Sequence, residues 1–309
     1  MSNSLIDAHG LTKRYGQFTA VDHLDLQIQE GEVFGFLGPN GSGKSTTILM
    51  LLGLTEPSEG HAEVCGFDPT RAPLQVKRQV GYLPESVGFY NDLTGKENLL
   101  YMASLNKIPR AAAEHKAAEF LGMVDLAGAA NQLVGQYSRG MKQRLGLAEV
   151  LMKEPRLVIL DDPTLGLDPA GVQWLLQLIQ EMSAQRQIAV FISSHQLQEV
   201  QRICHRVGIM SHGKLVLQGT VDDLMSHLES GGYLLEIEVS GGDGLSDVVR
   251  AIPGVQRCEA HGSRLVVEAN TDIRSQLVAA VAEHGAGLLE LRSHNNTLED
   301  IYLRYFQDN

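Results

Sequence analysis

The sequence lacks any apolar run long enough to cross a lipid bilayer. Its longest apolar stretch extends from Ile48 to Leu54, whereas a membrane-spanning helix needs about 20 such residues. The first ten residues have neither the basic start nor the apolar core of a signal peptide. We therefore expect a subunit that is soluble by its own sequence, with any membrane role supplied by a partner.

Cysteine and basic residues are also scarce. The three cysteines, Cys65, Cys204 and Cys258, are widely spaced and form no CxxC pair, which favours free thiols in a reducing compartment. The 25 Lys and Arg residues are outnumbered by 37 Asp and Glu residues, giving a net charge of −12. Binding to nucleic-acid phosphates needs clustered Lys and Arg. We therefore expect no nucleic acid partner. The acidic net charge does not exclude a compact phosphate-binding site.

The pattern of apolar segments predicts two domains. Residues 1–230 alternate short apolar runs with helical segments, which is typical of an α/β domain. Residues 95–153, rich in Ala, Leu and charge, predict a mainly helical subdomain. The central-strand candidates are 33–38, 157–162 and 188–194.

Glycine pairs between Ser230 and Gly244 mark a change of composition. Residues 231–309 contain no lysine, and their pattern predicts the strand and helix order βαββαβ, a ferredoxin-like α+β arrangement. A last amphipathic segment, LEDIYLRYF, closes the chain and favours a role of this accessory domain in dimerisation.

The segment GPNGSGKS matches the phosphate-binding pattern G-x-x-x-x-G-K-[ST] between a predicted strand and a predicted helix. Its glycines let backbone N–H groups converge on a phosphate, and the helix N-terminus adds a positive dipole end. Lys44 is expected to reach the β- and γ-phosphates, Ser45 to bind Mg²⁺, and Thr46 to touch the α-phosphate. The predicted loop consists of Gly38, Pro39, Asn40, Gly41, Ser42, Gly43, Lys44 and Ser45.

Four further motifs follow a recognisable order. An aromatic residue, Tyr15, precedes the loop in KRYG; YSRGMKQRLGLA begins at Tyr137; LVILDDPTLGLDP begins at Leu157; and ISSH ends at His195. Together with the loop, these motifs resemble the nucleotide-binding subunit of an ABC transporter over about residues 5–230. GYLPES, SRGMKQRL and the closing LEDIYLRY are similar to the ATPases that serve ABC-2-type exporters.

The resemblance implies a P-loop ABC-type ATPase fold and a role for each motif. Tyr15 stacks on adenine, and Asp161 holds Mg²⁺ through the water shell of the ion. Ser138 and Gly140 meet the γ-phosphate bound to the opposite subunit. His195 contacts the γ-phosphate and helps to orient the attacking water, while Asp168 lies along the seam of the dimer.

Two positions depart from the family pattern. The residue after Asp161 is normally a glutamate that polarises the attacking water, and here it is Asp162. Since aspartate is one methylene shorter, we expect a slow site rather than a dead one. Glu85 stands where many relatives have the glutamine that contacts the metal and the water. The segment after it, with Phe89 and Tyr90, is where relatives meet the membrane subunit.

The leading hypothesis is therefore an ATP-hydrolysing motor subunit, bound peripherally to the cytoplasmic side of the cell membrane. It implies ATP and Mg²⁺ as ligands, transmembrane permease subunits as partners, and pairing with a second ATPase subunit, either identical or different. One alternative is a regulatory subunit whose slow site is paired with a different ATPase. A soluble ABC protein without a transport role is disfavoured by the single cassette and the −12 charge.

Overall fold

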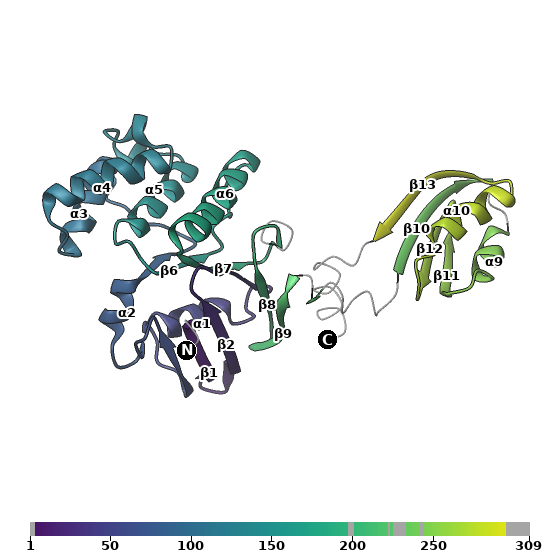
Figure 1. Ribbon diagram of the computed structural model, residues 1–309, viewed down its shortest axis with the longest axis horizontal. Helices are drawn as coiled ribbons and strands as arrows, with labels where there is room; N and C mark the ends of the chain where they lie inside the picture. Colours follow the sequence, from purple (N-terminus) through teal and green to yellow (C-terminus); the bar gives the residue numbers. More distant parts are fainter. Residues whose placement is uncertain (1–3, 197–200, 222, 225–232, 242–243, 295–309) are drawn as a thin grey trace. The chain divides into compact units, whose positions relative to one another are not determined.

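The computed structural model describes residues 4–196, 201–221, 223–224, 233–241 and 244–294 (Figure 1). The chain divides into two compact units, Met1–Gly219 and Thr220–Asn309. The predicted domain boundary between residues 230 and 231 and the closing LEDIYLRYF segment both lie outside the described residues. Each unit is considered by itself below.

A six-stranded sheet forms the centre of the first unit. Strand β3 lies between β7 and β8 and runs parallel to both, and β6 is likewise parallel to β5 and β7. Every residue of β3, β6 and β7 is buried, as expected for parallel strands covered on both faces. In spatial order the strands are β5 (Val80–Leu83), β6 (Leu157–Asp161), β7 (Ala189–Ser194), β3 (Val33–Leu37), β8 (Arg206–Ser211) and β9 (Lys214–Thr220).

A three-stranded antiparallel sheet accompanies it in the same unit. Strand β1 (Ser4–Tyr15) lies between β2 (Phe18–Gln29) and β4 (Glu59–Val64). The tight β1–β2 hairpin pairs Tyr15 with Phe18, so both aromatic residues lie at the same end of this sheet.

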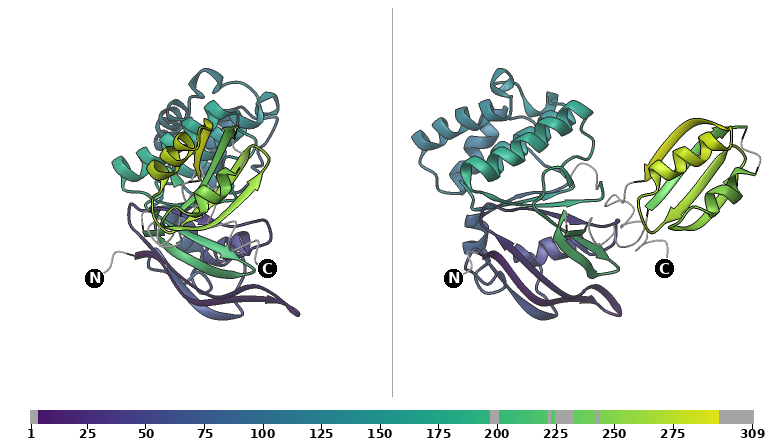
Figure 2. Two further views of the ribbon diagram at one scale, coloured as in Figure 1. Left: turned by 90° about the vertical axis from the view of Figure 1, so that its right-hand side faces the viewer. Right: turned by 45° about the vertical axis from the view of Figure 1, so that its right-hand side comes forward.

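Helices complete the first unit. Helix α1 (Lys44–Leu51) follows β3, α2 (Pro73–Gln79) precedes β5, and α6 (Pro169–Arg186) lies between β6 and β7 in the chain. The segment expected to be helical contains α3 (Gly95–Leu105), α4 (Arg110–Met123), the short 3₁₀ turns η1 (Ala127–Ala129) and η2 (Val134–Gln136), and α5 (Arg139–Leu151). In Figure 2, α3 to α6 gather on one side of the central sheet.

The second unit is a four-stranded antiparallel sheet with two helices. Its spatial order is β11-β12-β10-β13, so the first and last strands of this unit, β10 and β13, are neighbours, as in a ferredoxin-like fold. The elements are β10 (Tyr233–Ser240), α9 (Leu245–Arg250), β11 (Val255–His261), β12 (Arg264–Ala269), α10 (Arg274–Glu283) and β13 (Gly287–His294). The predicted βαββαβ order is confirmed.

Candidate functional site

The predicted phosphate loop leaves the carboxyl end of β3, in the middle of the parallel sheet. Gly41 and Gly43 have φ angles of 83° and 107°, in the left-handed region that glycine enters without strain. A Cβ atom on Gly43 would lie 2.4 Å from the Ala20 carbonyl oxygen, and one on Gly38 would lie 2.6 Å from the Met210 carbonyl oxygen. The loop backbone therefore requires glycine at these positions.

Lys44 is the first residue of α1 and is only 5% exposed. Its Nζ donates to the carbonyl oxygens of Gly38 at 2.7 Å and Pro39 at 3.1 Å. Burial lowers the pKa of the Lys44 ammonium, while the carboxylates of Asp162 and Asp161 oppose that shift. The loop thus encloses a cation whose charge is favoured by two carboxylates at the end of β6, two strands away from β3 in the sheet.

A cavity of about 350 Å³ opens beside this loop. It brings together residues from four places in the chain: the start of β2, the phosphate loop, the segment after β5, and the end of β6. Its lining consists of Phe18, Ala20, Asn40, Gly41, Gly43, Lys44, Ser45, Thr46, Glu85 and Asp162. Parallel sheets bind ligands at the carboxyl ends of their strands, and this cavity lies at those ends.

Phe18 and Ala20 are the two lining residues that the sequence motifs did not indicate, and Phe18 is the aromatic one. It is 63% exposed and pairs with Tyr15 across the β1–β2 hairpin. Tyr15, the predicted adenine contact, is 51% exposed, has the Lys13 Nζ 5.2 Å from its ring centroid, and does not line the cavity. The place of Phe18 three positions after Tyr15 is the feature of the sequence that could have indicated a second aromatic residue at the site.

The two acidic residues at the end of β6, its last residue Asp161 and the following Asp162, have different environments. Asp161 accepts a hydrogen bond from the Ser193 hydroxyl at 2.6 Å. Asp162 has a φ of 44°, and its Oδ1 lies 2.8 Å from His195 Nδ1 and accepts from the His195 backbone N–H at 3.2 Å. The structure therefore brings the predicted Asp162 and His195 into direct contact.

Two other predicted residues cap helices near this strand end. The Ser138 hydroxyl accepts from the Met141 N–H at 3.2 Å and caps α5. Asp168 accepts from the Gly171 N–H at 3.0 Å and caps α6. Both N-termini carry positive dipole ends. The predicted residues that do not line the cavity are Tyr15, Gly38, Pro39, Ser42, Ser138, Gly140, Asp161, Asp168 and His195.

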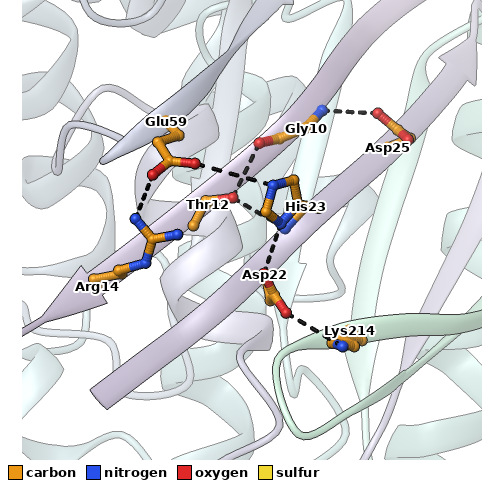
Figure 3. Close-up of polar contacts among 8 residues, drawn as sticks. All are labelled: Gly10, Thr12, Arg14, Asp22, His23, Asp25, Glu59 and Lys214. Atoms are coloured by element: carbon orange, nitrogen blue, oxygen red, sulfur yellow. Dashed lines mark hydrogen bonds and ion pairs between the residues drawn. The ribbon is translucent and has the colours of Figure 1, made fainter. Parts of the chain in front are cut away.

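A polar cluster fastens the loop to the antiparallel sheet. The Gly213 N–H donates to the Ser42 carbonyl at 3.0 Å, and the Gly213 carbonyl accepts from the Asp22 N–H at 2.8 Å. Figure 3 shows the Asp22 carboxylate between His23, at 2.7 Å, and Lys214, at 3.3 Å. Hydrogen bonds from His23 and Lys214 lower the pKa of Asp22. The loop is thus tied to strand β2 independently of its own hydrogen bonds.

The loop also contains an unsatisfied polar atom. Among the described residues, the Ser42 hydroxyl oxygen is buried without a hydrogen-bond partner. Buried polar atoms are nearly always paired. With the glycine cradle and the buried Lys44, this atom fits a loop built around a polyanion.

No helix in the described part of the chain is long and apolar enough to cross a membrane. The residues described here also contain no group of three or more His, Cys, Asp or Glu side chains placed to hold a metal ion.

The sequence is similar to proteins of known family. A family model described as ABC transporter matches residues 21–165. The chain is 35% identical over 303 residues to the bacitracin transport ATP-binding protein BcrA of Bacillus licheniformis, covering 98% of this chain and 97% of that protein. It is 32% identical over 303 residues to the daunorubicin/doxorubicin resistance ATP-binding protein DrrA of Streptomyces peucetius, with 96% and 91% covered.

Solved structures agree with these sequence matches. One described as the ATP binding subunit of an ABC transporter has a TM-score of 0.66 and 30% identity, covering 72% of this chain and 93% of that one. A bacterial ABC transporter cassette solved as a dimer has a TM-score of 0.64 and 25% identity, with 70% and 98% covered.

Proposed function

Since this chain belongs to the family of ABC transporter ATP-binding subunits and is an ATPase that drives transport, we propose that ATP binds in the cavity beside Gly38–Ser45. The observation that supports this placement is the cavity itself, which joins the phosphate loop to Glu85 and Asp162. The triphosphate lies on the loop, where the backbone N–H groups and Lys44 neutralise its charge.

Mg²⁺, when bound, neutralises charge that develops on the phosphates during transfer. The residues of this chain that would hold it are Ser45, through its hydroxyl, Glu85, through its carboxylate, and Asp161, through the water shell of the ion. Mg²⁺ sites of this kind use one or two carboxylates together with substrate phosphates, so they need no cluster of three protein ligands. Ser45 and Glu85 both line the cavity, and the hydrogen bond from Ser193 fixes the orientation of Asp161.

Asp162 and His195 are proposed to prepare the attacking water. The Asp162 carboxylate accepts a proton from the water or orients it, and its contact with His195 Nδ1 directs the opposite ring nitrogen, Nε2, away from Asp162. Nε2 then faces the γ-phosphate. In the full chain, Lys44→Ala should abolish phosphate release from ATP, because it removes the cation of the loop; release at the wild-type rate would contradict this placement.

The adenine ring is proposed to stack at the end of the β1–β2 hairpin. Phe18 lines the cavity, and Tyr15 pairs with it across the hairpin. We propose that one face of the base lies against this pair of aromatic residues.

A second ATPase subunit completes each site in this proposal. Ser138 and Gly140 at the start of α5 face the γ-phosphate bound by the other subunit, and Asp168 at the start of α6 lies along the seam. ATP then holds the two ATPase subunits together at their phosphate loops, and hydrolysis weakens their association. The aspartate at position 162 also favours a second arrangement, in which this chain is the slow, regulatory half of an unequal pair.

The partner that crosses the membrane is proposed to be a permease of the ABC-2 exporter kind, with this chain on its cytoplasmic face. BcrA is named for bacitracin transport and DrrA for daunorubicin and doxorubicin resistance, which supports export.

We propose that the permease docks beside Tyr90, which is 56% exposed and lies edge-on to Tyr101, with ring centroids 5.0 Å apart. Replacing Phe89 and Tyr90 with alanine should reduce co-purification with the permease. Phe67→Ala, at another exposed aromatic residue, is the control. Full assembly of the double variant would count against this docking site.

A further inference from the structure

The only tryptophan of the sequence, Trp174, lies under a cation. The guanidinium carbon of Arg144 is 4.2 Å from the centroid of the Trp174 ring, a typical cation–π distance. Arg144 belongs to α5 and Trp174 to α6, and these helices lie side by side in the views of Figures 1 and 2. The contact therefore joins the helical segment of residues 95–153 to α6, the helix that connects strands β6 and β7 of the central sheet.

Arg144 is also held on its other side. Its Nη1 donates to the Val124 carbonyl at 3.4 Å and lies 3.1 Å from the Asp125 carboxylate. The side chain is 23% exposed. A planar guanidinium can stack on a ring and donate from its edge at once, which an ammonium cannot do. The arginine thus connects the end of α4 with both α5 and α6.

The position of this contact along the two helices is the same. Arg144 comes six residues after the α5 cap Ser138, and Trp174 comes six residues after the α6 cap Asp168. At about 1.5 Å per residue, each side chain lies about 9 Å along its helix from the cap. A contact at equal height on two helices fixes how far one N-terminus extends past the other.

Contacts nearer the two caps also join α5 to the segment before α6. The Gln143 amide donates to the Pro163 carbonyl at 3.2 Å. A Cβ atom on Gly140 would lie 3.6 Å from a Leu167 methyl carbon, an ordinary packing distance. The start of α5 therefore packs on the segment that leads into α6.

We propose that Arg144 and Trp174 are positioning residues that keep the N-termini of α5 and α6 in register, so that Ser138 and Asp168 reach the second subunit together. This inference rests on the proposed function, in which both N-termini face that subunit.

The test uses the full chain with ATP and Mg²⁺. Trp174→Leu and Arg144→Met should each lower kcat about fivefold to tenfold, because a displacement well below 1 Å at the caps already slows transfer. KM for ATP should stay within about twofold, since the phosphate loop is untouched. Trp174→Phe keeps an aromatic face and should recover most of the rate. The double variant should be no slower than the slower single one, because both remove the same contact.

Arg186→Met is the matched control. Arg186 stacks on Phe120 of α4 at 5.5 Å and pairs with Glu119 at 2.9 Å, so it also joins α6 to the helical segment. It lies 18 residues from the α6 cap and should leave kcat unchanged. The emission of Trp174 should shift in Arg144→Met, since the charge leaves the ring, and should not shift in Arg186→Met.

Several results would overturn the inference. These are wild-type kcat in both Trp174→Leu and Arg144→Met, a raised KM with unchanged kcat, an equal loss of kcat in Arg186→Met, or unshifted tryptophan emission in Arg144→Met. A wild-type chain that does not hydrolyse ATP would instead refute the proposed function, and the inference with it. Thermal unfolding of each variant separates these outcomes from a general loss of folding.

Discussion

Replacing Asp162 with glutamate should make the enzyme faster. In the structure the Asp162 carboxylate reaches only as far as His195, at 2.8 Å from Nδ1. Glutamate extends the carboxylate by one methylene, about 1.5 Å, toward the cavity that Asp162 lines. Since a misplacement of about 1 Å can cost on the order of a hundredfold in rate, we expect kcat to rise by about tenfold to a hundredfold.

The same substitution should cost stability. Asp162 has a φ of 44°, and aspartate tolerates the left-handed region better than glutamate because its short side chain bonds locally. We expect the free energy of unfolding of Asp162→Glu to fall by up to about 1 kcal/mol. Asp162→Asn keeps the shape but loses the charge, and should lower kcat by about a hundredfold or more.

Phosphate release at saturating ATP and Mg²⁺, measured at several protein concentrations, gives kcat for all three chains. Urea unfolding gives their stability. The reasoning fails if Asp162→Glu binds ATP normally but turns over no faster than the wild type. It also fails if Asp162→Asn keeps the wild-type rate, because the carboxylate would then have no part in the reaction.

Three further predictions concern the rest of the chain. Ser138→Ala should lower the free energy of unfolding by about 1 kcal/mol, because the α5 cap is lost. Ser138→Asp should keep the cap but lower kcat, because its charge repels the γ-phosphate. Equal kcat in Ser138→Asp and the wild type would contradict the proposed phosphate contact. Burial raises the pKa of the Cys65 thiol from 9.0 to about 11, so the thiol loses its proton at lower pH in the unfolded chain than in the folded one. The free energy of unfolding should therefore fall as the pH rises from 9 to 11. Urea unfolding should show a smaller fall in Cys65→Ala. Phe18→Ala should weaken ATP binding at least as much as Tyr15→Ala in equilibrium titrations, since Phe18 lines the cavity.

The parts of the site that could be predicted are those encoded locally. The phosphate loop needs glycine at Gly41 and Gly43 because of their left-handed backbone, and that requirement is visible in the spacing alone. The βαββαβ order of the second unit followed from the length and alternation of its segments.

Contacts between distant segments could not be predicted in this way. Asp162 and His195 are 33 positions apart and meet because β6 and β7 are adjacent parallel strands. Phe18 reaches the cavity through the register of the hairpin, and the stack of Arg144 on Trp174 depends on how two helices pack. Periodicity gives the face of each element but does not specify its neighbour.

Gly213 lies between the phosphate loop, which it contacts, and strand β9, which it precedes in the chain. Its N–H holds the Ser42 carbonyl of the phosphate loop, and the next residue, Lys214, begins the seven-residue strand β9. That strand ends at Thr220, where the second compact unit begins. Along the chain, strand β9 is therefore the segment that connects the second unit to the glycine whose N–H binds the phosphate loop.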